Sequence, residues 1–353
     1  MKLFLLAGLF VFFSSNLFAQ KAYYVREDGQ GSGLTWTDAS GDLQAMINKA
    51  SEGDSIFVAA GKYIPGRPAD QVGLGTVNST NRDNAFVLKK GVKIFGGFAA
   101  TGNPSFSARN WTDNLCVLSG DIGEENDNTD NVYHVIISVD DDKATILDGF
   151  TISGGVAQEA TPYHTTTVEG KQIATNHGGG MCNMASSPTL KNNIFNSNQA
   201  QGWGGAIYNA NASSPDISYT EFTENAAFNG GAVFNNTSSS PAISHCTFKT
   251  NNAGSNGGAM DNELSSSPKI TYCKFSENFA TKNGGAMANY SHSSPQVTNS
   301  LFANNATYGS LNSVVVSGGG AMFNSYACLP IITNCTFSGN KVTFPDVHGG
   351  GGA

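Results

Sequence analysis

The sequence predicts an all-β protein: a right-handed parallel β-helix solenoid with a short N-terminal capping helix. Three observations support this prediction. A unit of about 27 residues recurs six times in the C-terminal half, four kinds of marker residue keep one register within it, and the runs between the markers are only four to six residues long. Runs this short, bounded by Gly, Ser, Pro and Asn, indicate strands rather than helices.

The markers follow one another in the same order in every unit. A Gly-Gly pair opens the unit, an Asn follows, a Pro comes next, and a Phe precedes a second Asn by three residues. The first glycine of each pair is Gly178, Gly204, Gly230, Gly257, Gly284 or Gly319, and the Asn that follows is Asn183, Asn209, Asn235, Asn262, Asn289 or Asn324. The Pro is Pro188, Pro215, Pro241, Pro268, Pro295 or Pro330. The Phe and its Asn are Phe195/Asn198, Phe222/Asn225, Phe248/Asn251, Phe275/Asn278, Phe302/Asn305 and Phe337/Asn340. Because equivalent residues of neighbouring coils lie roughly 4.8 Å apart, we expect a Phe stack in the core and hydrogen-bonded Asn ladders at the turns.

The N-terminal half is less regular. Leu43, Met46, Ile47 and Ala50 have the spacing of one face of an amphipathic helix, which predicts a short helix that covers the first open coil. Strands of irregular early coils are predicted at 55–59, 85–98, 116–120 and 133–153.

Four segments are expected along the chain. Lys2, the apolar run that follows it and Ala19 predict a signal peptide at 1–19, and therefore an exported protein. The segments after it are a cap region, irregular coils with loop insertions and regular repeats, at 20–54, 55–177 and 178–353. The final Gly-rich run is typical of the start of another unit, so the repeats are expected to continue in a longer protein.

Composition and charge exclude several partners. The formal net charge of −8 and the pI of about 5.2 offer no basic surface for nucleic acid. After the signal peptide, no segment is apolar over a length that spans a membrane. Cys246, Cys273 and Cys335 share one repeat position with Thr, Ser and Asn, which favours buried thiols; a bridge between Cys246 and Cys273 is the alternative.

All length variation between units enters at one corner, between the Phe/Asn marker and the next Gly pair. Insertions at one corner stack along one side of the rod, so 156–177 and 306–317 are candidate recognition loops. The predicted ligand contacts are Tyr163, His164, His177 and Tyr308. Surface decoration without a ligand is the alternative.

An acidic stretch at 121–131 is the candidate ion site. Its Asp, Glu and Asn oxygens at short spacing suit calcium, which takes six to eight oxygen ligands. The predicted ligands are Asp121, Glu124, Glu125, Asp127 and Asp130. A solvated acidic loop is the alternative, and no other cofactor is predicted.

Catalysis is an alternative because parallel β-helices include polysaccharide lyases and hydrolases. Hydrolysis uses two carboxylates about 5–9.5 Å apart. Glu224 and Glu277 share one repeat position two coils apart, or about 10 Å, and Glu221 occupies a varied outward position. A solvated face accounts for these glutamates, so no catalytic residue is predicted.

The paired motifs Gly-Gly-Ala-Ile/Val/Met and Phe-x-x-Asn resemble the repeats of chlamydial-type polymorphic outer membrane proteins. The glycine motif occurs at 204–207, 230–233, 257–260, 284–287 and 319–322. The resemblance covers about 178–353 and implies a pectate-lyase-like fold, surface exposure and adhesion.

The leading hypothesis is therefore a non-catalytic bacterial protein, secreted or held at the outer membrane surface, that binds an extracellular glycan or a surface protein. A polysaccharide lyase or glycoside hydrolase and a structural stalk are the alternatives.

Overall fold

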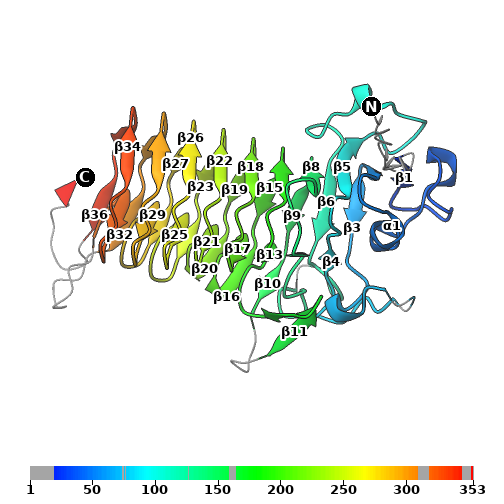
Figure 1. Cartoon of the computed structure of the whole chain (residues 1–353), viewed down its shortest axis with the longest axis horizontal. Helices are drawn as coiled ribbons and strands as arrows, with labels where there is room; N and C mark the ends of the chain where they lie inside the picture. Colours follow the sequence, from blue (N-terminus) through cyan, green and yellow to red (C-terminus); the bar gives the residue numbers. More distant parts are fainter. Residues whose placement is uncertain are drawn as a thin grey trace, which may run out of the picture.

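The chain winds into a rod of stacked coils (Figure 1). The computed structural model describes residues 20–73, 75, 77–125, 127–158, 164–308, 318–343 and 351–352, so the predicted signal peptide and Tyr163 lie outside the described residues. Each regular coil contributes one strand to each of four sheets, and strands of successive coils pair in parallel. The all-β solenoid predicted from the repeats is confirmed.

A regular coil passes through the four sheets, named I to IV, in a fixed order. Sheet I contains β4 (Phe86–Val87), β7 (Ile136–Val139), β13 (Met181–Met184), β17 (Ile207–Ala210), β21 (Val233–Asn235), β25 (Met260–Asn262), β29 (Met287–Asn289) and β33 (Met322–Asn324). Sheet II contains β1 (Ala22–Val25), β2 (Ser55–Ala59), β5 (Lys93–Phe98), β8 (Ile146–Asp148), β14 (Thr189–Lys191), β18 (Asp216–Ser218), β22 (Ala242–Ser244), β26 (Lys269–Thr271), β30 (Gln296–Thr298) and β34 (Ile331–Thr333). Sheet III contains β3 (Gly61–Tyr63), β6 (Cys116–Ser119), β9 (Thr151–Ser153), β15 (Ile194–Asn196), β19 (Glu221–Thr223), β23 (Thr247–Lys249), β27 (Lys274–Ser276), β31 (Leu301–Ala303) and β35 (Thr336–Ser338). Sheet IV contains β10 (Val156–Ala157), β16 (Gln199–Trp203), β20 (Ala226–Asn229), β24 (Asn252–Ala253), β28 (Phe279–Ala280), β32 (Ala306–Tyr308), β36 (Lys341–Thr343) and β37 (Gly351–Gly352), the last of which pairs antiparallel with β36.

The core of the rod is built from columns of identical side chains. The six marker Phe rings stack face to face, with centroids 4.6–5.3 Å apart and interplanar angles of 3–9°. The first five marker Asn residues after a Phe each donate to the equivalent Asn of the next coil, as in the Asn225–Asn251 pair at 3.0 Å. The first Asn set forms a second ladder, with 2.8 Å between Asn183 and Asn209. The predicted stack and ladders are confirmed.

The Gly pairs are required by both backbone conformation and space. Gly230 has φ +61°, and a Cβ on Gly231 would lie 2.2 Å from the carbonyl oxygen of Gly258 on the next coil. A side chain at the second glycine would therefore push neighbouring coils apart. The six cysteines are free, and the thiols of Cys246 and Cys273 are buried, so the alternative bridge between them is absent.

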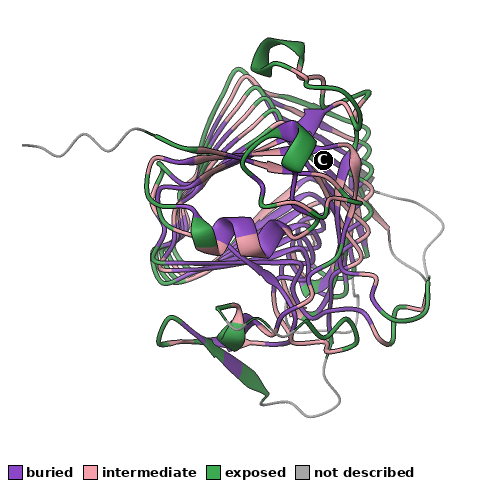
Figure 2. Ribbon diagram, turned by 90° about the vertical axis from the view of Figure 1, so that its right-hand side faces the viewer, coloured by how far each residue is buried: buried purple, intermediate pink, exposed green. Residues whose placement is uncertain are grey.

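The predicted capping helix is present as α1 (Leu43–Lys49), which lies across the N-terminal end of the coils (Figure 2). Asp42 caps it by accepting from the amide of Ala45 at 2.8 Å. The buried Gln44 side chain accepts from the amide of Val87 at 2.9 Å and donates to its carbonyl at 3.2 Å. Gln44 thus pairs with the edge strand β4 as a neighbouring strand would, and this protects the open edge.

Two long runs predicted as strands are divided by turns. The run at 85–98 contains β4 and β5, and the run at 133–153 contains β7, β8 and β9, because the chain turns a corner of the coil inside each run. Short 3₁₀ helices occur at Trp36–Asp38, Ala69–Gln71 and Phe106–Ala108. Among the described residues, no helix has the length and apolar character needed to cross a membrane.

Candidate ligand-binding groove

A shallow groove runs over sheet IV, on the side of the rod where the insertions enter. Side chains alternate along each strand of sheet IV. On each coil one small side chain therefore points into the core, and the residues before and after it point to the surface. On three successive coils the inward residues are Ala200, Ala227 and Ala253. The outward positions beside them carry Gln199, Gln201, Ala226, Phe228, Asn252 and Gly254.

Two adjoining hollows of about 390 and 320 Å³ form the groove, and they share Gln158, Gln199 and Gln201. Amide side chains therefore line its length. At one end the lining includes Arg82, Asn128 and Thr129; at the other it includes Ala226, Ala227, Asn252 and Gly254. Among the described lining residues Arg82 is the one ionisable side chain, so this surface offers hydrogen bonds rather than a carboxylate pair.

Arg82 fixes the end of the groove. Its Nε donates to the carbonyl of Asn131 at 2.7 Å and its Nη2 to the carbonyl of Val156 at 3.1 Å. Its guanidinium lies 4.3 Å from the ring centroid of Tyr133. These contacts hold the acidic turn against β10, which brings Asn128 into the groove.

The acidic turn itself is held by internal hydrogen bonds. The carboxylate of Asp130 accepts from the amide of Glu124 at 2.8 Å, and that of Asp127 accepts from both the amide and the hydroxyl of Thr129, which lowers the pKa of Asp127. Asp121 lies 3.4 Å from Lys62. Within the part of the chain that the structure describes, no three His, Cys, Asp or Glu side chains form a metal-binding group. The predicted calcium ligands, Glu125 among them, thus remain a prediction without a supporting cluster.

The described part of the first insertion includes a packed hairpin. It contains β11 (Thr165–Val168) and β12 (Lys171–Ala174), and its buried Val168 and Ile173 pack against the outer face of sheet I. His164 lies 3.9 Å from Asp83 and beside the ring of Tyr133.

His177 lies in different surroundings from His164, although the sequence placed both at the ends of one loop. Its ring stacks on Trp203 at 4.3 Å, and burial lowers its pKa to about 4. The His177 ring therefore packs beside sheet IV, and its predicted ligand contact stays a prediction.

Exposed aromatic rings continue the groove toward the C-terminal coils. Phe228 and Tyr308 are 49% and 47% exposed, and Tyr308 packs edge-on against Phe279 at 4.9 Å. Phe228 lies beside Gly254, and a Cβ placed on Gly254 would lie 3.6 Å from the ring, an ordinary van der Waals contact. Tyr308, predicted from the second insertion, therefore belongs to this face.

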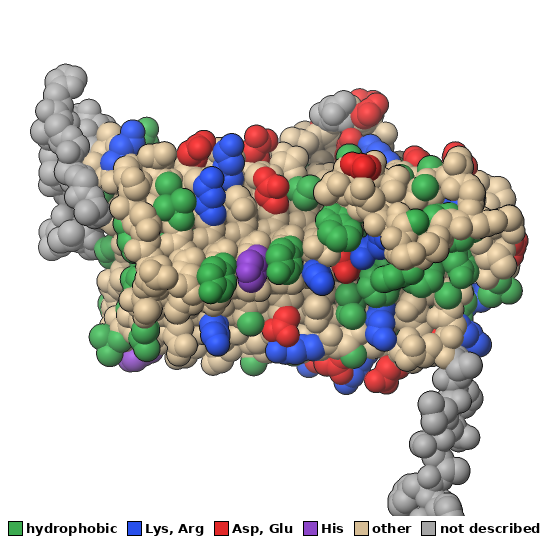
Figure 3. Space-filling model, turned by 90° about the horizontal axis from the view of Figure 1, so that it is seen from above, with side chains coloured by type: hydrophobic (Ala, Val, Ile, Leu, Met, Phe, Trp, Pro, Cys, Tyr) green, Lys and Arg blue, Asp and Glu red, His purple; other side chains and the backbone are tan. Residues whose placement is uncertain are grey.

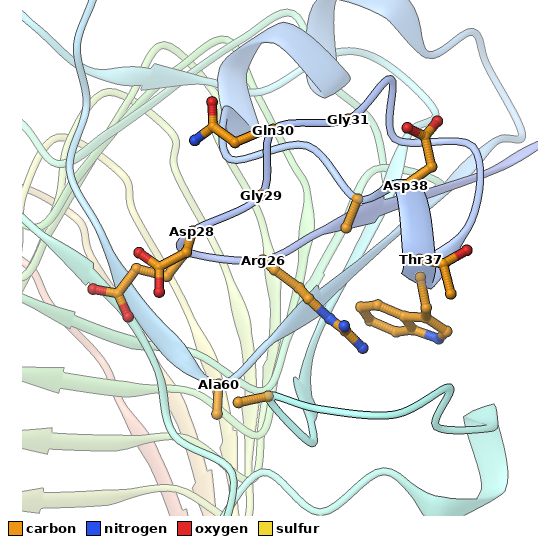
Figure 4. Close-up of a pocket in the computed structure, with 12 residues that line it drawn as sticks. Arg26, Asp28, Gly29, Gln30, Gly31, Thr37, Asp38 and Ala60 are labelled. Carbon is orange, nitrogen blue, oxygen red and sulfur yellow. The ribbon is translucent and has the colours of Figure 1, made fainter.

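A larger hollow, of about 530 Å³, lies in the N-terminal cap (Figure 4). The carboxylates of Asp28 and Asp38 lie on opposite sides of it, with Arg26 between them. Arg26 is already engaged, since its guanidinium lies 5.1 Å from the Trp36 ring centroid and donates to the carbonyl of Gly102. Asp38 accepts from the hydroxyl of Ser32, so Arg26 and Asp38 are both held by contacts within the cap.

A buried carboxyl on sheet I is a feature that sequence reasoning missed. Asp261 is fully buried, neither of its oxygens has a hydrogen-bond partner, and burial raises its pKa well above the usual value. Glu263 follows two residues later, and burial raises its pKa as well. The equivalent positions on the adjacent coils carry Phe234 and Ala288. The sequence pattern that could have predicted this buried carboxyl is therefore an acidic residue at an otherwise apolar repeat position.

The groove amides were also missed, although the register could have located them. Gln199 follows the marker Asn198 directly, and Asn252 follows Asn251. Glu224 and Glu277, the glutamates considered as catalytic residues, lie outside the groove. They occupy exposed turns between sheets III and IV, and the coil between them carries Thr250 at the same position.

Comparisons with known proteins agree with this architecture. A family model described as "Right handed beta helix region" matches residues 135–302. Among solved structures, the chain is similar to pectate lyase Pel9A, with a TM-score of 0.50 and 12% identity over 90% of this chain and 78% of that one. A rhamnogalacturonan lyase gives a TM-score of 0.43 and 13% identity over 91% and 74%. No curated protein matches the sequence significantly. The fold is a right-handed parallel β-helix, as the repeats predicted.

Proposed function

We propose that this protein is an exported, non-catalytic binding protein that holds an extended glycan in the groove over sheet IV. The observation that carries the proposal is the lining of the groove. Amide side chains can donate to and accept from sugar hydroxyls, and the small outward residues Ala226 and Gly254 let a sugar ring approach closely. Phe228 and Tyr308 add exposed rings on which the apolar face of a sugar can pack.

Two further points support a surface role. The repeat motifs resemble those of polymorphic outer membrane proteins, which implies adhesion, and the N-terminal segment has the composition of a signal peptide. Secretion or display at the outer membrane of a bacterium is the localisation that fits both.

The test is retention of the purified chain on soluble polysaccharides in affinity electrophoresis, with neutral xylan and glucan beside acidic polygalacturonate. We expect retention, with affinity reduced about tenfold or more when Gln199 and Gln201 are both changed to Ala, since each hydrogen bond contributes about 1 kcal/mol. Gln296→Ala is the matched control, because this exposed amide lies on sheet II, outside the groove.

Chain cleavage is scored in the same samples as new reducing or unsaturated ends. Cleavage would replace the binding proposal with an enzyme. If the double variant is retained as strongly as the parent chain, the glycan does not bind in the groove over sheet IV.

A further inference from the structure

Three exposed aromatic rings form a ridge at the turn between sheets II and III, remote from the groove. Tyr219 stacks on His245 at 4.8 Å with an interplanar angle of 13°, and His245 stacks on Tyr272 at 5.2 Å and 20°. Tyr219 and Tyr272 are 55% and 57% exposed. Figure 3 shows the ridge as one histidine in line between two hydrophobic side chains along the rod.

The backbone at this ridge favours a different residue. Tyr219, His245 and Tyr272 have φ of 49°, 55° and 54°, in the left-handed region. Other coils carry Asn at the same turn position, as at Asn192 and Asn299, with φ of 53° and 50°. Asn adopts this conformation more readily than Tyr, so the coils that carry Tyr219 and Tyr272 accept strain to display these rings.

One outward column on each side of the ridge carries an acidic residue at one end and a basic residue at the other. On sheet III the column Glu221, Thr247, Lys274 runs beside the rings, one residue from each coil. On sheet II the corresponding column is Asp216, Ala242, Lys269.

We propose that this face binds a second copy of the chain, with the two rods antiparallel. A two-fold axis across the ridge at His245 places Tyr219 of one copy against Tyr272 of the other. The same rotation places Glu221 opposite Lys274, and Asp216 opposite Lys269, twice each. Such an isologous contact needs a self-complementary surface, and all three columns satisfy that condition about the same coil.

The parallel arrangement is disfavoured by the same charges. Rotation about the rod axis would bring Glu221 of one copy near Asp216 of the other and Lys274 near Lys269. Like charges facing one another weaken association, whereas complementary pairs fix the register. Asp216 also pairs with Lys143 of its own chain at 2.9 Å, so Glu221 and Lys274 are the residues to test.

Sedimentation velocity of the purified chain at low salt, over a wide concentration range, tests the proposal. We expect a monomer–dimer equilibrium that Glu221→Lys or Lys274→Glu alone weakens at least about tenfold, because each puts like charges together at two places. An equimolar mixture of the two variants should form heterodimers with at least the parent's affinity, because every pair in the mixed dimer is again complementary.

Ring removal gives an independent measurement. Tyr219→Asn with Tyr272→Asn installs the residue that other coils carry there, so the fold is kept while dimerisation should fall at least about tenfold. Phe228→Ala, on the groove face, is the control and should leave the equilibrium unchanged. A parent chain that stays monomeric at every concentration, or single charge variants that fail to associate when mixed, would overturn the proposal.

Discussion

The regular array and the irregular N-terminal coils differ in how they satisfy the hydrogen bonds and charges of buried polar side chains. In the array a buried polar side chain bonds to its own kind: Asn251 accepts from Asn225 and donates to Asn278, each at 3.0 Å. In the N-terminal coils the partners are unlike, as in the Arg109–Asp148 ion pair. In a ladder, many equivalent hydrogen bonds share the contribution to the free energy of unfolding. In the irregular coils, a single ion pair contributes a large part of it.

The largest effect is therefore expected in the irregular half. Arg109 Nη2 lies 2.6 Å from Asp148 Oδ1, and the two side chains are 6% and 9% exposed. Arg109→Met would leave a buried carboxylate without its charge partner and should lower the free energy of unfolding by about 3–5 kcal/mol. Equilibrium urea denaturation measures this.

The control changes both members of the pair. Arg109→Met with Asp148→Leu should recover part of the loss, since no unpaired charge remains. A single variant as stable as the parent would show that unique pairs do not concentrate stability in these coils.

A smaller effect is expected from breaking a ladder. Asn251→Ala removes the acceptor for the amide of Asn225 at 3.1 Å and the donor to the carbonyl of Phe222 at 2.9 Å. These buried groups would lose their partners, so we expect a loss of about 2–3 kcal/mol in urea denaturation.

The comparison variant is Asn340→Ala, at the last described rung of the same ladder. Asn340 accepts from Asn305 and donates to Phe302 but has no described rung beyond it, so its loss should be smaller. Equal losses at both positions would mean that the ladder is not cooperative along the rod.

The periodic part of the molecule was predictable because each coil repeats the same physical constraints. The Gly230 turn, the Phe248 stack and the Asn251 ladder all follow from one register, so the sequence identified the core without a structure. The cap was predictable from a different pattern, the helical spacing of Leu43 and Ile47.

The candidate site was harder to predict because it depends on outward residues that differ from coil to coil. The sequence pointed to the corner beside sheet IV and singled out His177, whose ring stacks on Trp203. Gln199 and Gln201 could not be predicted from the repeats, because the equivalent outward positions of the other coils carry different residues. Arg82 reaches the groove from a distant part of the chain, and only the folded coil shows that contact.

Asp261 breaks the rule of the array, because it is an acid without a partner in an apolar column. Asp261→Ala, which copies Ala288 on the next coil, should raise the free energy of unfolding by about 1–2 kcal/mol at neutral pH. The folded state raises the pKa of Asp261 above its ordinary value of 3.8, so folding favours the protonated acid. The parent should therefore lose stability as pH rises above about 4, the unfolded value.

Urea denaturation at several pH values measures this difference. The gap between Asp261→Ala and the parent should be smallest near pH 4 and should widen as the pH rises. Glu263→Gln, at the neighbouring and less buried carboxyl, is the comparison and should produce a weaker effect of the same sign. A gap that narrows with rising pH would contradict the assignment.

The smallest effect is expected where the two regions meet at the surface. Lys143, from the irregular half, lies 2.9 Å from Asp216 in the array, but the side chains are 62% and 38% exposed. An exposed ion pair contributes little, so Lys143→Ala should change the free energy of unfolding by less than about 1 kcal/mol, and added salt should reduce even that. A loss as large as that of Arg109→Met would mean that the junction, and not the interior of either region, limits the stability of the rod. Stability would then depend on how the irregular coils seat on the array, and the contrast between ladders and unique pairs would no longer explain where the molecule is weakest.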